Sequence, residues 1–239
     1  MRFESNNNKA HTTINLTLCA IKGVAYECWQ QELIDIETYM RIKMIKKRKG
    51  TRAPVGRILG FDEINKIKRY FSHHRTNRDI RNYAVFTLAC GSGLRRRELL
   101  LLDVGDITEN TVTIHGKGNK SRKVQLSEFV SNAVNAWINT ANRKSGPLFS
   151  KIDKKDVVQC NRISTMGIGC IIRQIIEECR LEHFTPHDLR RTFATTLFDI
   201  GADQLAVKEL MGHTSLNTTA IYDRRGEKKK IDAIKLLPF

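Results

Sequence analysis

Apolar residues recur at helical spacing over most of the chain after residue 60, and one stretch interrupts that pattern. Phe61–Phe71 is the first such segment, with Ile64 and Ile67 spaced to lie on a single buried helix face. The interruption consists of two short alternating segments, Thr111–His115 and Arg122–Leu126, separated by the glycine-containing sequence GKGNKS. Threonine and valine on the arms with glycines between them are typical of a β-hairpin. The sequence therefore predicts an α+β fold that is mainly α-helical and contains a small antiparallel β-sheet.

The other elements of this domain follow from the same periodicity and from end signals. Thr185-Pro186 reads as a helix cap followed by proline at the first helical position, and Gly201 is placed to close the same helix. Asn217 or Thr218 is expected to cap a short helix that carries Tyr222 near its end. The remaining predicted elements are helix 79–90, a helix from residue 94 with the apolar run 99–102, helix 127–142, an edge strand at 147–150, helix 167–180 and helix 203–211.

Two further helices are predicted at Thr12–Gln31 and Asp35–Ile45, after a polar leader. The sequence between residues 38 and 61 then contains eight lysines and arginines and no acidic residue. Gly50, Pro54 and Gly56 within it mark an exposed basic linker. We therefore divide the chain into a helical region at 1–49, a basic linker at 50–60 and a larger domain at 61–239, which ends in a tail at 223–239.

The formal net charge of +16 is far from neutral for 239 residues. A charge of this size favours a polyanionic partner, most simply nucleic acid, over the alternative of a solvated basic surface. The basic segment has two interpretations, a strand that crosses DNA and neutralises phosphates or a solvated run, and the first agrees with the rest of the chain. Its expected DNA contacts are Lys47, Arg48, Lys49 and Arg52.

Membrane, metal and redox roles find no support in the sequence. No apolar run approaches the ~18 residues of a membrane span, and the polar N-terminus shows no secretory signal. The six cysteines form no CxxC pair and no zinc-finger spacing with histidines, which favours buried reduced thiols. A carboxylate cluster for magnesium, an HExxH motif and a nucleotide phosphate loop are also missing. We expect a cytoplasmic, nucleoid-associated protein that uses no cofactor and no metal.

The stretch from Thr185 to Tyr222 collects side chains that suit phosphate chemistry. His187 and Arg190 are three residues apart and so share a helix face, while His213 and Tyr222 follow on the next short helices. Each has an ordinary alternative when taken singly: a helix-start histidine, a surface arginine or a core tyrosine. Their joint occurrence in order and spacing supports the chemical interpretation.

Two residues from earlier in the chain complete the set. Arg95 lies at a glycine-permitted helix junction, and Glu98, one turn on, is placed to orient it by an ion-paired hydrogen bond. Lys117 lies between two glycines at the hairpin tip, although a lysine in a turn is also ordinary. Arginines suit a phosphate and its pentavalent transition state, and a lysine can protonate a departing alkoxide. Because cations and a base make a phenol a useful nucleophile, the set predicts attack of Tyr222 on a DNA phosphodiester without metal or nucleotide.

The combination of motifs resembles the tyrosine recombinase (phage integrase) family, in particular its Xer and integron types. The motifs are GLRRRELLLL at 93–102, GKGNKSRKVQL at 116–126, HDLRRTFAT at 187–195, LMGH at 210–213 and a tyrosine nine residues beyond that last histidine. The resemblance implies a site-specific DNA recombinase that cleaves and rejoins strands through a 3′-phosphotyrosyl intermediate. The residues that match the family's catalytic positions are Arg95, Lys117, His187, Arg190, His213 and the nucleophile Tyr222.

The resemblance also implies roles and partners. The two arginines and His213 would hold the scissile phosphate, Lys117 would be the acid for the 5′ oxygen, and His187 would assist proton transfer. Double-stranded DNA with paired recombination sites is the implied partner. The implied assembly is a homo-tetramer on DNA, joined through the C-terminal tail. In the absence of DNA a monomer is an alternative. Further expected DNA contacts beside the motifs are Lys120, Arg122 and Arg191.

Two departures from the family pattern leave alternatives open. Arg96 and Arg97 stand where the family has an apolar and a small residue, so they either touch DNA or disturb the seating of Arg95. The region 1–49 corresponds only to the last part of the family's helical core-binding domain, which binds DNA. One alternative is a type IB topoisomerase-like strand-passing enzyme. Another is a non-enzymatic or partner-dependent DNA-binding derivative of a recombinase, against which the complete catalytic set argues.

Overall fold

The computed structural model describes residues 10–50, 56–116, 121–223, 226 and 234–235. The chain forms two compact units, Met1–Val55 and Gly56–Phe239, whose boundary falls within the predicted basic linker. No helix in these described ranges is long and apolar enough to cross a lipid bilayer.

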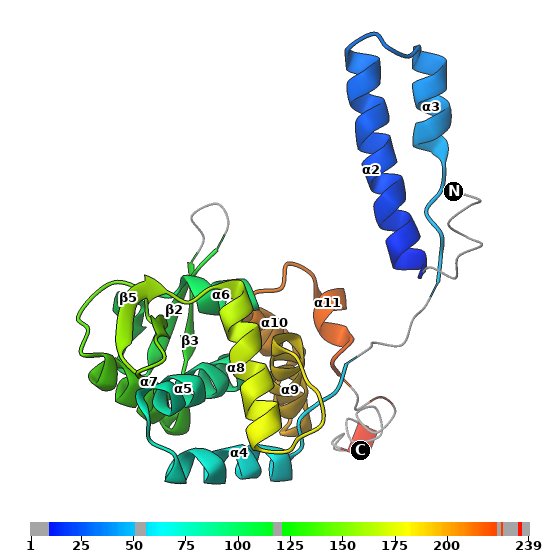
Figure 1. The fold of residues 1–239 in the computed structure, drawn as a ribbon. Coiled ribbons are helices and arrows are strands. Elements are labelled where there is room, and N and C mark those ends of the chain that lie inside the picture. The colour runs from blue at the N-terminus through cyan, green and yellow to red at the C-terminus, as the bar shows by residue number, and fades with distance from the viewer. Residues whose placement is uncertain (1–9, 51–55, 117–120, 224–225, 227–233, 236–239) are drawn as a thin grey trace. The chain divides into compact units, whose positions relative to one another are not determined.

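The N-terminal unit is a helical hairpin in which α2 (His11–Gln30) and α3 (Ile36–Met44) run antiparallel (Figure 1). Asp35 caps α3, since its side chain accepts a hydrogen bond of 2.6 Å from a backbone N–H in the first turn. The Trp29 ring stacks on Tyr39 with the ring centroids 5.1 Å apart. Both helices predicted for this region are therefore confirmed.

The basic segment after α3 is held against α2 by two polar side chains. The Asn15 amide pairs with the backbone N–H and carbonyl of Arg48 at 2.8 and 2.9 Å. The Lys22 ammonium donates to the carbonyls of Lys43 and Ile45 at 2.5 and 2.7 Å. Residues 46–49 thus lie beside α2 with all of their side chains exposed.

The larger unit holds the remaining elements, and most of them match the predicted ranges. In chain order they are α4 (Phe61–His73), α5 (Asn77–Ser92), α6 (Arg96–Leu101), the 3-10 turn η1 (Val104–Asp106), β1 (Ile107–Thr108), β2 (Thr111–His115), β3 (Ser121–Gln125), α7 (Glu128–Ala141), β4 (Ser150–Ile152), β5 (Val158–Arg162), α8 (Thr165–Glu178), α9 (Pro186–Asp199), α10 (Gln204–Met211) and α11 (Leu216–Ala220).

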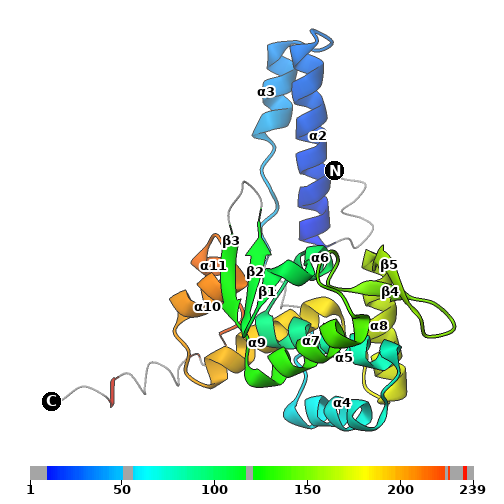
Figure 2. The ribbon, with the colours of Figure 1, turned by 90° about the vertical axis from the view of Figure 1, so that its left-hand side faces the viewer.

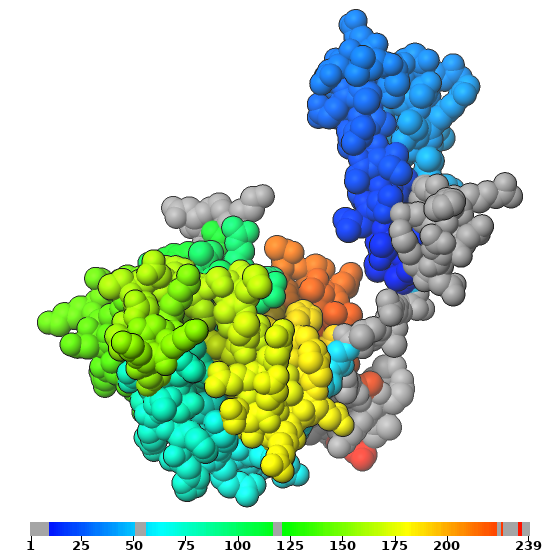
Figure 3. Space-filling model, in the orientation of Figure 1, coloured from blue at the N-terminus to red at the C-terminus, as the bar shows by residue number. Residues whose placement is uncertain are grey.

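Helix α5 forms the centre of this unit. Ten of its sixteen residues are buried, because α4, α7, α8 and α9 all pack against it. Both ribbon views place α4 at the opposite end of the unit from the β2–β3 hairpin (Figures 1 and 2). In the space-filling view α8, in yellow, and the light green β4–β5 region form a continuous surface on one face (Figure 3).

The predicted hairpin is confirmed and carries a third, short strand. The sheet order is β1-β2-β3, all antiparallel, and Thr111 pairs with Gln125. Val112, Ile114 and Val124 point into the core while their neighbours on the strands are more exposed. This alternation follows from the two-residue period of a strand and attaches the hairpin to the helices.

The second sheet differs from the prediction of an edge strand at 147–150. Strand β4 begins at Ser150, which pairs with Arg162 of β5, while Pro147 forms only an isolated bridge with Asp103. A proline cannot donate to a sheet ladder, so the strand starts after it. The partner strand β5, with the sequence VQCNR, lies outside the predicted elements, because only two of its residues are apolar and none is buried.

The apolar residues of the larger unit form two clusters. The main core surrounds Phe86, Trp137 and Phe184 and unites α4 to α8 with the three-stranded sheet. A smaller core lies among α9, α10 and α11, where Phe198 and Met211 pack with the ring of Tyr222. The tyrosine of the predicted site is therefore built into a separate small core.

Replacing Trp137 with alanine is expected to lower the free energy of unfolding by ~3–5 kcal/mol, because a fully buried indole leaves a cavity. The change also removes the hydrogen bond of 2.7 Å from its ring N–H to the Leu148 carbonyl. Chemical denaturation followed by circular dichroism measures the difference. Phe61, which is 79% exposed, is the control, and Phe61→Ala should change this free energy by less than ~0.5 kcal/mol. Equal effects of the two substitutions would contradict the assignment of the core.

Candidate active site

Five of the six predicted catalytic residues line one pocket of about 550 Å³ in the larger unit. The α5–α6 junction contributes Arg95, and the first turns of α9 contribute His187 and Arg190. His213 follows α10, and Tyr222 follows α11. Among the described residues, the pocket is lined by Leu94, Arg95, Arg96, Thr185, Pro186, His187, Arg190, His213, Thr218 and Tyr222.

Three hydrogen bonds hold Arg95 at the mouth of the pocket. Its backbone N–H and Nη1 donate to the two carboxylate oxygens of Glu98 at 2.8 and 2.9 Å, and Nη2 donates to the Gly212 carbonyl at 3.0 Å. The side chain is still 47% exposed, so other N–H groups face solvent. Arg96 lines the pocket and Arg97 is exposed, and Arg95 keeps its contacts beside both. The two extra arginines therefore do not disturb its seating.

Glu98 is the anion that organises these cations, with its side chain 13% exposed. Besides Arg95, Arg122 donates to both carboxylate oxygens at 3.0 and 2.9 Å, and the Arg190 guanidinium lies 3.9 Å away. Burial alone would raise the pKa of Glu98, but hydrogen bonds from Arg122 and Arg95 lower it to about 2. The carboxylate is therefore ionised at neutral pH.

Arg190 is almost completely buried, with 3% of its surface exposed. Its Nη1 donates to the Gly93 carbonyl, and Nη2 donates to the Met211 carbonyl at 2.7 Å and to His213 Nε2 at 2.8 Å. Burial lowers the pKa of Arg190 to about 10, which still leaves it charged at neutral pH. The guanidinium is thus a fixed cation at the base of the pocket.

The partners of His213 determine its tautomer. A guanidinium can only donate, so Nε2 accepts from Arg190 and carries no proton. Nδ1 then carries the proton and donates to the Thr219 hydroxyl at 2.8 Å. Burial and the nearby arginines, Arg190 first, lower the pKa of His213 to about 4, so the ring is neutral at pH 7. Sequence reasoning missed Thr219, because nothing local marks it as the partner of a histidine.

Tyr222 is 4% exposed and lies just beyond α11. Its ring stacks on the His213 ring with centroids 6.1 Å apart, and the Arg191 guanidinium carbon lies 5.8 Å from its centre. Ser215 caps α11 rather than the predicted Asn217 or Thr218, because its side chain accepts from a backbone N–H of the first turn at 3.3 Å. The cation–π contact and the small core together fix the phenol ring.

His187 stands at the start of α9 with an exposed side chain. The helix begins as predicted, since the Thr185 hydroxyl and the Asp188 carboxylate form a capping box. Partial burial and the positive charges of Arg191 and Arg190 lower the pKa of His187. This favours a neutral ring that can accept a proton. Lys117, the sixth predicted catalytic residue, lies outside the described residues.

The residues predicted to contact DNA lie in different surroundings. Lys47, Arg48 and Lys49 are exposed in the N-terminal unit. Two others lie inside the domain, because Arg122 is bonded to the Glu98 carboxylate and Arg191 is buried under the Tyr222 ring. The contacts with DNA that the sequence predicts for these two arginines stay predictions. The two left over, Arg52 and Lys120, lie outside the described residues.

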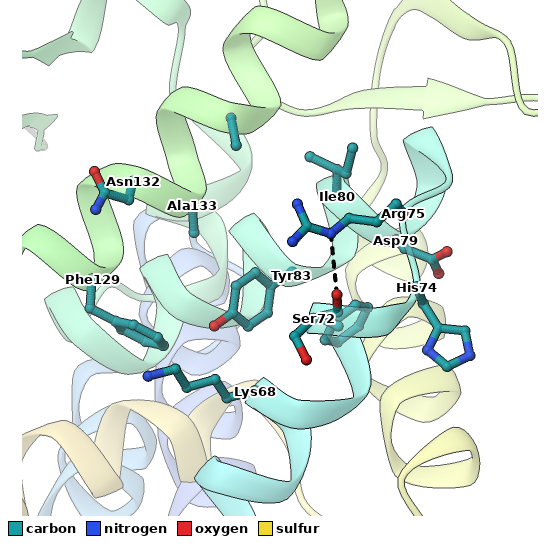
Figure 4. Close-up of a pocket in the computed structure, with 12 residues that line it drawn as sticks. Lys68, Ser72, His74, Arg75, Asp79, Ile80, Tyr83, Phe129, Asn132 and Ala133 are labelled. Carbon is teal, nitrogen blue, oxygen red and sulfur yellow. Dashed lines mark hydrogen bonds between the residues drawn. The ribbon is translucent and has the colours of Figure 1, made fainter.

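A second pocket, of about 320 Å³, lies between α4, α5 and α7 and contains none of the catalytic candidates (Figure 4). The Lys68 ammonium lies 5.3 Å from the centre of the Phe129 ring, and Arg75 Nε donates to the Ser72 carbonyl at 3.4 Å. Burial raises the pKa of Tyr83 to about 12, which makes this phenol a poor nucleophile. We therefore place the chemistry in the first pocket. Over the described part of the chain, no three His, Cys, Asp or Glu side chains are grouped to hold a metal ion.

Comparison with known proteins identifies the family to which the chain belongs. The phage integrase family matches residues 57–229 of the chain. A tyrosine recombinase XerC from Pelotomaculum thermopropionicum is 31% identical over 229 residues, which cover 92% of this chain and 73% of that protein. The tyrosine recombinase XerC of Corynebacterium glutamicum is 27% identical over 233 residues, which cover 95% of this chain and 72% of that protein.

The fold is also found among solved structures. The Tn1549 transposon integrase in complex with a circular intermediate DNA superposes with a TM-score of 0.69. The match covers 97% of this chain and 82% of the other at 17% sequence identity, so it concerns the fold alone. The predicted class, mainly α-helical with small antiparallel sheets, is confirmed.

The ring of His213 is expected to stay neutral down to about pH 4. Because this pKa lies below the ~6.5 of an unfolded histidine, the unfolded state binds more protons between these values, and protonation lowers stability as the pH falls through that window. NMR titration of the ring measures the midpoint. In Arg190→Gln the midpoint should rise, since one opposing cation is gone. A midpoint near ~6.5 in both proteins would contradict the assigned environment.

Proposed function

Because the chain belongs to the phage integrase family of tyrosine recombinases, we propose that it recombines DNA site-specifically by using Tyr222 as the nucleophile. The observation that carries this proposal is the shared pocket, in which Tyr222 lies with Arg95 and Arg190. Both guanidinium groups are held by carbonyl and carboxylate partners, so they are positioned before any phosphate arrives.

The scissile phosphate binds to Arg95 and Arg190, while the unprotonated Nε2 of His213 holds the Arg190 guanidinium in place. A guanidinium has five N–H donors, and the described contacts leave some of them unused on both Arg95 and Arg190. These donors suit the non-bridging oxygens of a phosphodiester and the additional negative charge of its pentavalent transition state. Since the arginines do not have to be recruited, their stabilisation is available during the reaction at little cost in reorganisation.

Strand cleavage then follows from the residues around the phosphate. The Tyr222 oxygen attacks phosphorus, the bond to the 5′ oxygen breaks, and the 3′-phosphate becomes linked to the tyrosine. His187 takes the phenol proton, and Lys117 gives a proton to the departing 5′ oxygen. The phosphotyrosyl link preserves the energy of the broken bond, so attack by a 5′ hydroxyl rejoins a strand without ATP. No metal is required in this scheme, because the arginines balance the charge of the phosphate.

The partner in this proposal is double-stranded DNA that carries paired recombination sites. The exposed basic residues Lys47, Arg48 and Lys49 of the N-terminal unit support contact with phosphates, together with Arg52 and Lys120 from the sequence. Exchange between two duplexes needs four active sites. We therefore propose a homo-tetramer on DNA, which the apolar residues near the C-terminus would join.

Tyr222→Phe is expected to abolish a covalent protein–DNA adduct. A selection of bound sequences from a random duplex pool supplies the site, which is then prepared with a nick beside the cleavage position. The short strand released by cleavage diffuses away, so native protein accumulates an adduct that resists SDS. Phenylalanine keeps the ring in its small core and removes only the hydroxyl.

Each result of this trap has a defined meaning. An adduct with native protein alone supports Tyr222 as the nucleophile. An adduct that persists in Tyr222→Phe rules this tyrosine out. DNA binding without an adduct by the native protein would favour the non-enzymatic alternative.

Adduct formation and strand exchange are expected to proceed at unchanged rates in excess EDTA and without ATP. A labelled duplex and an unlabelled partner duplex, each with the selected site, are incubated together and the recombinant strands are measured. Loss of activity in EDTA would contradict the metal-free mechanism. Relaxation of supercoiled DNA without any exchange between duplexes would favour the topoisomerase-like alternative.

A further inference from the structure

Arg122 points from β3 into the domain, where three of its N–H groups are used. Nη1 and Nη2 donate to Oε1 and Oε2 of Glu98 at 3.0 and 2.9 Å, and Nε donates to the Leu210 carbonyl at 3.2 Å. A Cβ added at Gly212 would lie 2.7 Å from Nη1, so the guanidinium also packs against this residue. One side chain thus joins the β2–β3 hairpin, α6 and the end of α10.

Glu98 depends on Arg122 for half of its hydrogen bonds. An ionised carboxylate has about four acceptor positions, and here Arg95 fills two while Arg122 fills the other two. The two-pronged contact of Arg122 fixes both the position and the plane of the carboxylate. Without it, a carboxylate that is only 13% exposed would lack partners and could draw the Arg95 guanidinium away from the pocket.

Arg122 also adjusts the charge that faces the phosphate. Three guanidinium groups, of Arg95, Arg122 and Arg190, surround one carboxylate and leave a net charge of +2. This charge matches a pentavalent phosphate that carries about two negative charges better than it matches the singly charged ground state. Neutralising Arg122 should therefore affect the cleavage step more than the binding of DNA.

We infer that Arg122 is a positioning residue for strand cleavage, which fixes the Glu98 carboxylate and through it holds Arg95 on the scissile phosphate. This inference rests on the proposed function. It replaces the DNA contact expected from the sequence, because most of the donors of Arg122 are already bonded inside the domain.

The test compares Arg122→Gln and Arg122→Lys with a matched control on the same strand. Lys123 is the next residue of β3 and is exposed, so Lys123→Gln removes the same charge without touching Glu98. Glu98→Gln and the double variant Glu98→Gln/Arg122→Gln complete a cycle. For each protein we would measure the rate of adduct formation at saturating nicked DNA, the dissociation constant and its dependence on salt.

Arg122→Gln should slow adduct formation on the order of 10²-fold, while its dissociation constant and salt dependence match those of Lys123→Gln. Arg122→Lys should recover part of the rate, since it restores the charge without the two-pronged contact. In the Glu98→Gln background, Arg122→Gln should slow adduct formation much less than it does in the native protein, because the residue acts mainly through this carboxylate.

Three results would overturn the inference. If Arg122→Gln forms the adduct at an unchanged rate at saturating DNA, and the slope of log affinity against log salt concentration falls by ~1, Arg122 is a direct phosphate contact. Equal slowing by Lys123→Gln would indicate a general effect of charge. If Arg122→Gln does not fold, the double variant serves in its place, because it replaces the ion pair by two neutral amides. Adduct formation that is much slower in the double variant than in Glu98→Gln would then contradict the inference. Absence of an adduct with native protein would instead refute the proposed function.

Discussion

The burial of the charged Arg190 side chain is the constraint that the rest of the site satisfies. A guanidinium inside a protein is costly unless acceptors surround it. Here Gly93 and Met211 supply backbone carbonyls and His213 supplies Nε2. The two carbonyls lie at the C-terminal ends of α5 and α10, where carbonyls lack partners within the helix and the helix dipole favours a cation. The Arg190 guanidinium therefore pairs with carbonyls at two helix C-termini, and these carbonyls favour its charged form.

The two glycines beside these carbonyls show how backbone geometry and charge are coupled. Gly93 and Gly212 both have φ of 61°, which glycine adopts without the strain that a side chain would cause. An added Cβ would clash with the Phe193 ring at the first glycine and would lie 2.7 Å from Arg122 Nη1 at the second. The turns that end α5 and α10 thus bring carbonyls to Arg190 and Arg95, and they leave room for the groups that fix them.

Most of the elements, and the five candidate residues that share the pocket, could be predicted because each has a local signal. Helical periodicity marks α4 to α9, and the Thr185 cap with its proline marks the start of the helix that carries Arg190. Contacts between distant residues have no such signal. A basic residue beside a glycine loop looks the same whether it faces DNA or, as Arg122 does, a carboxylate 24 residues away. The strand β5 likewise depends on its pairing with β4 more than on its own composition.

The formal charge of +16 overstates the positive surface that DNA can reach. Arg81 is buried and donates to the Ser150 carbonyl at 3.2 Å, and Arg162 donates to two carbonyls at the end of α6. Like Arg122 and Arg190, these arginines use several donors at once, and each of them donates to at least one backbone carbonyl inside the domain. Affinity from counterion release depends on cations that touch phosphates. The exposed lysines and arginines should therefore determine the salt dependence of DNA binding, while the internal arginines shape the pocket that we propose for the scissile phosphate.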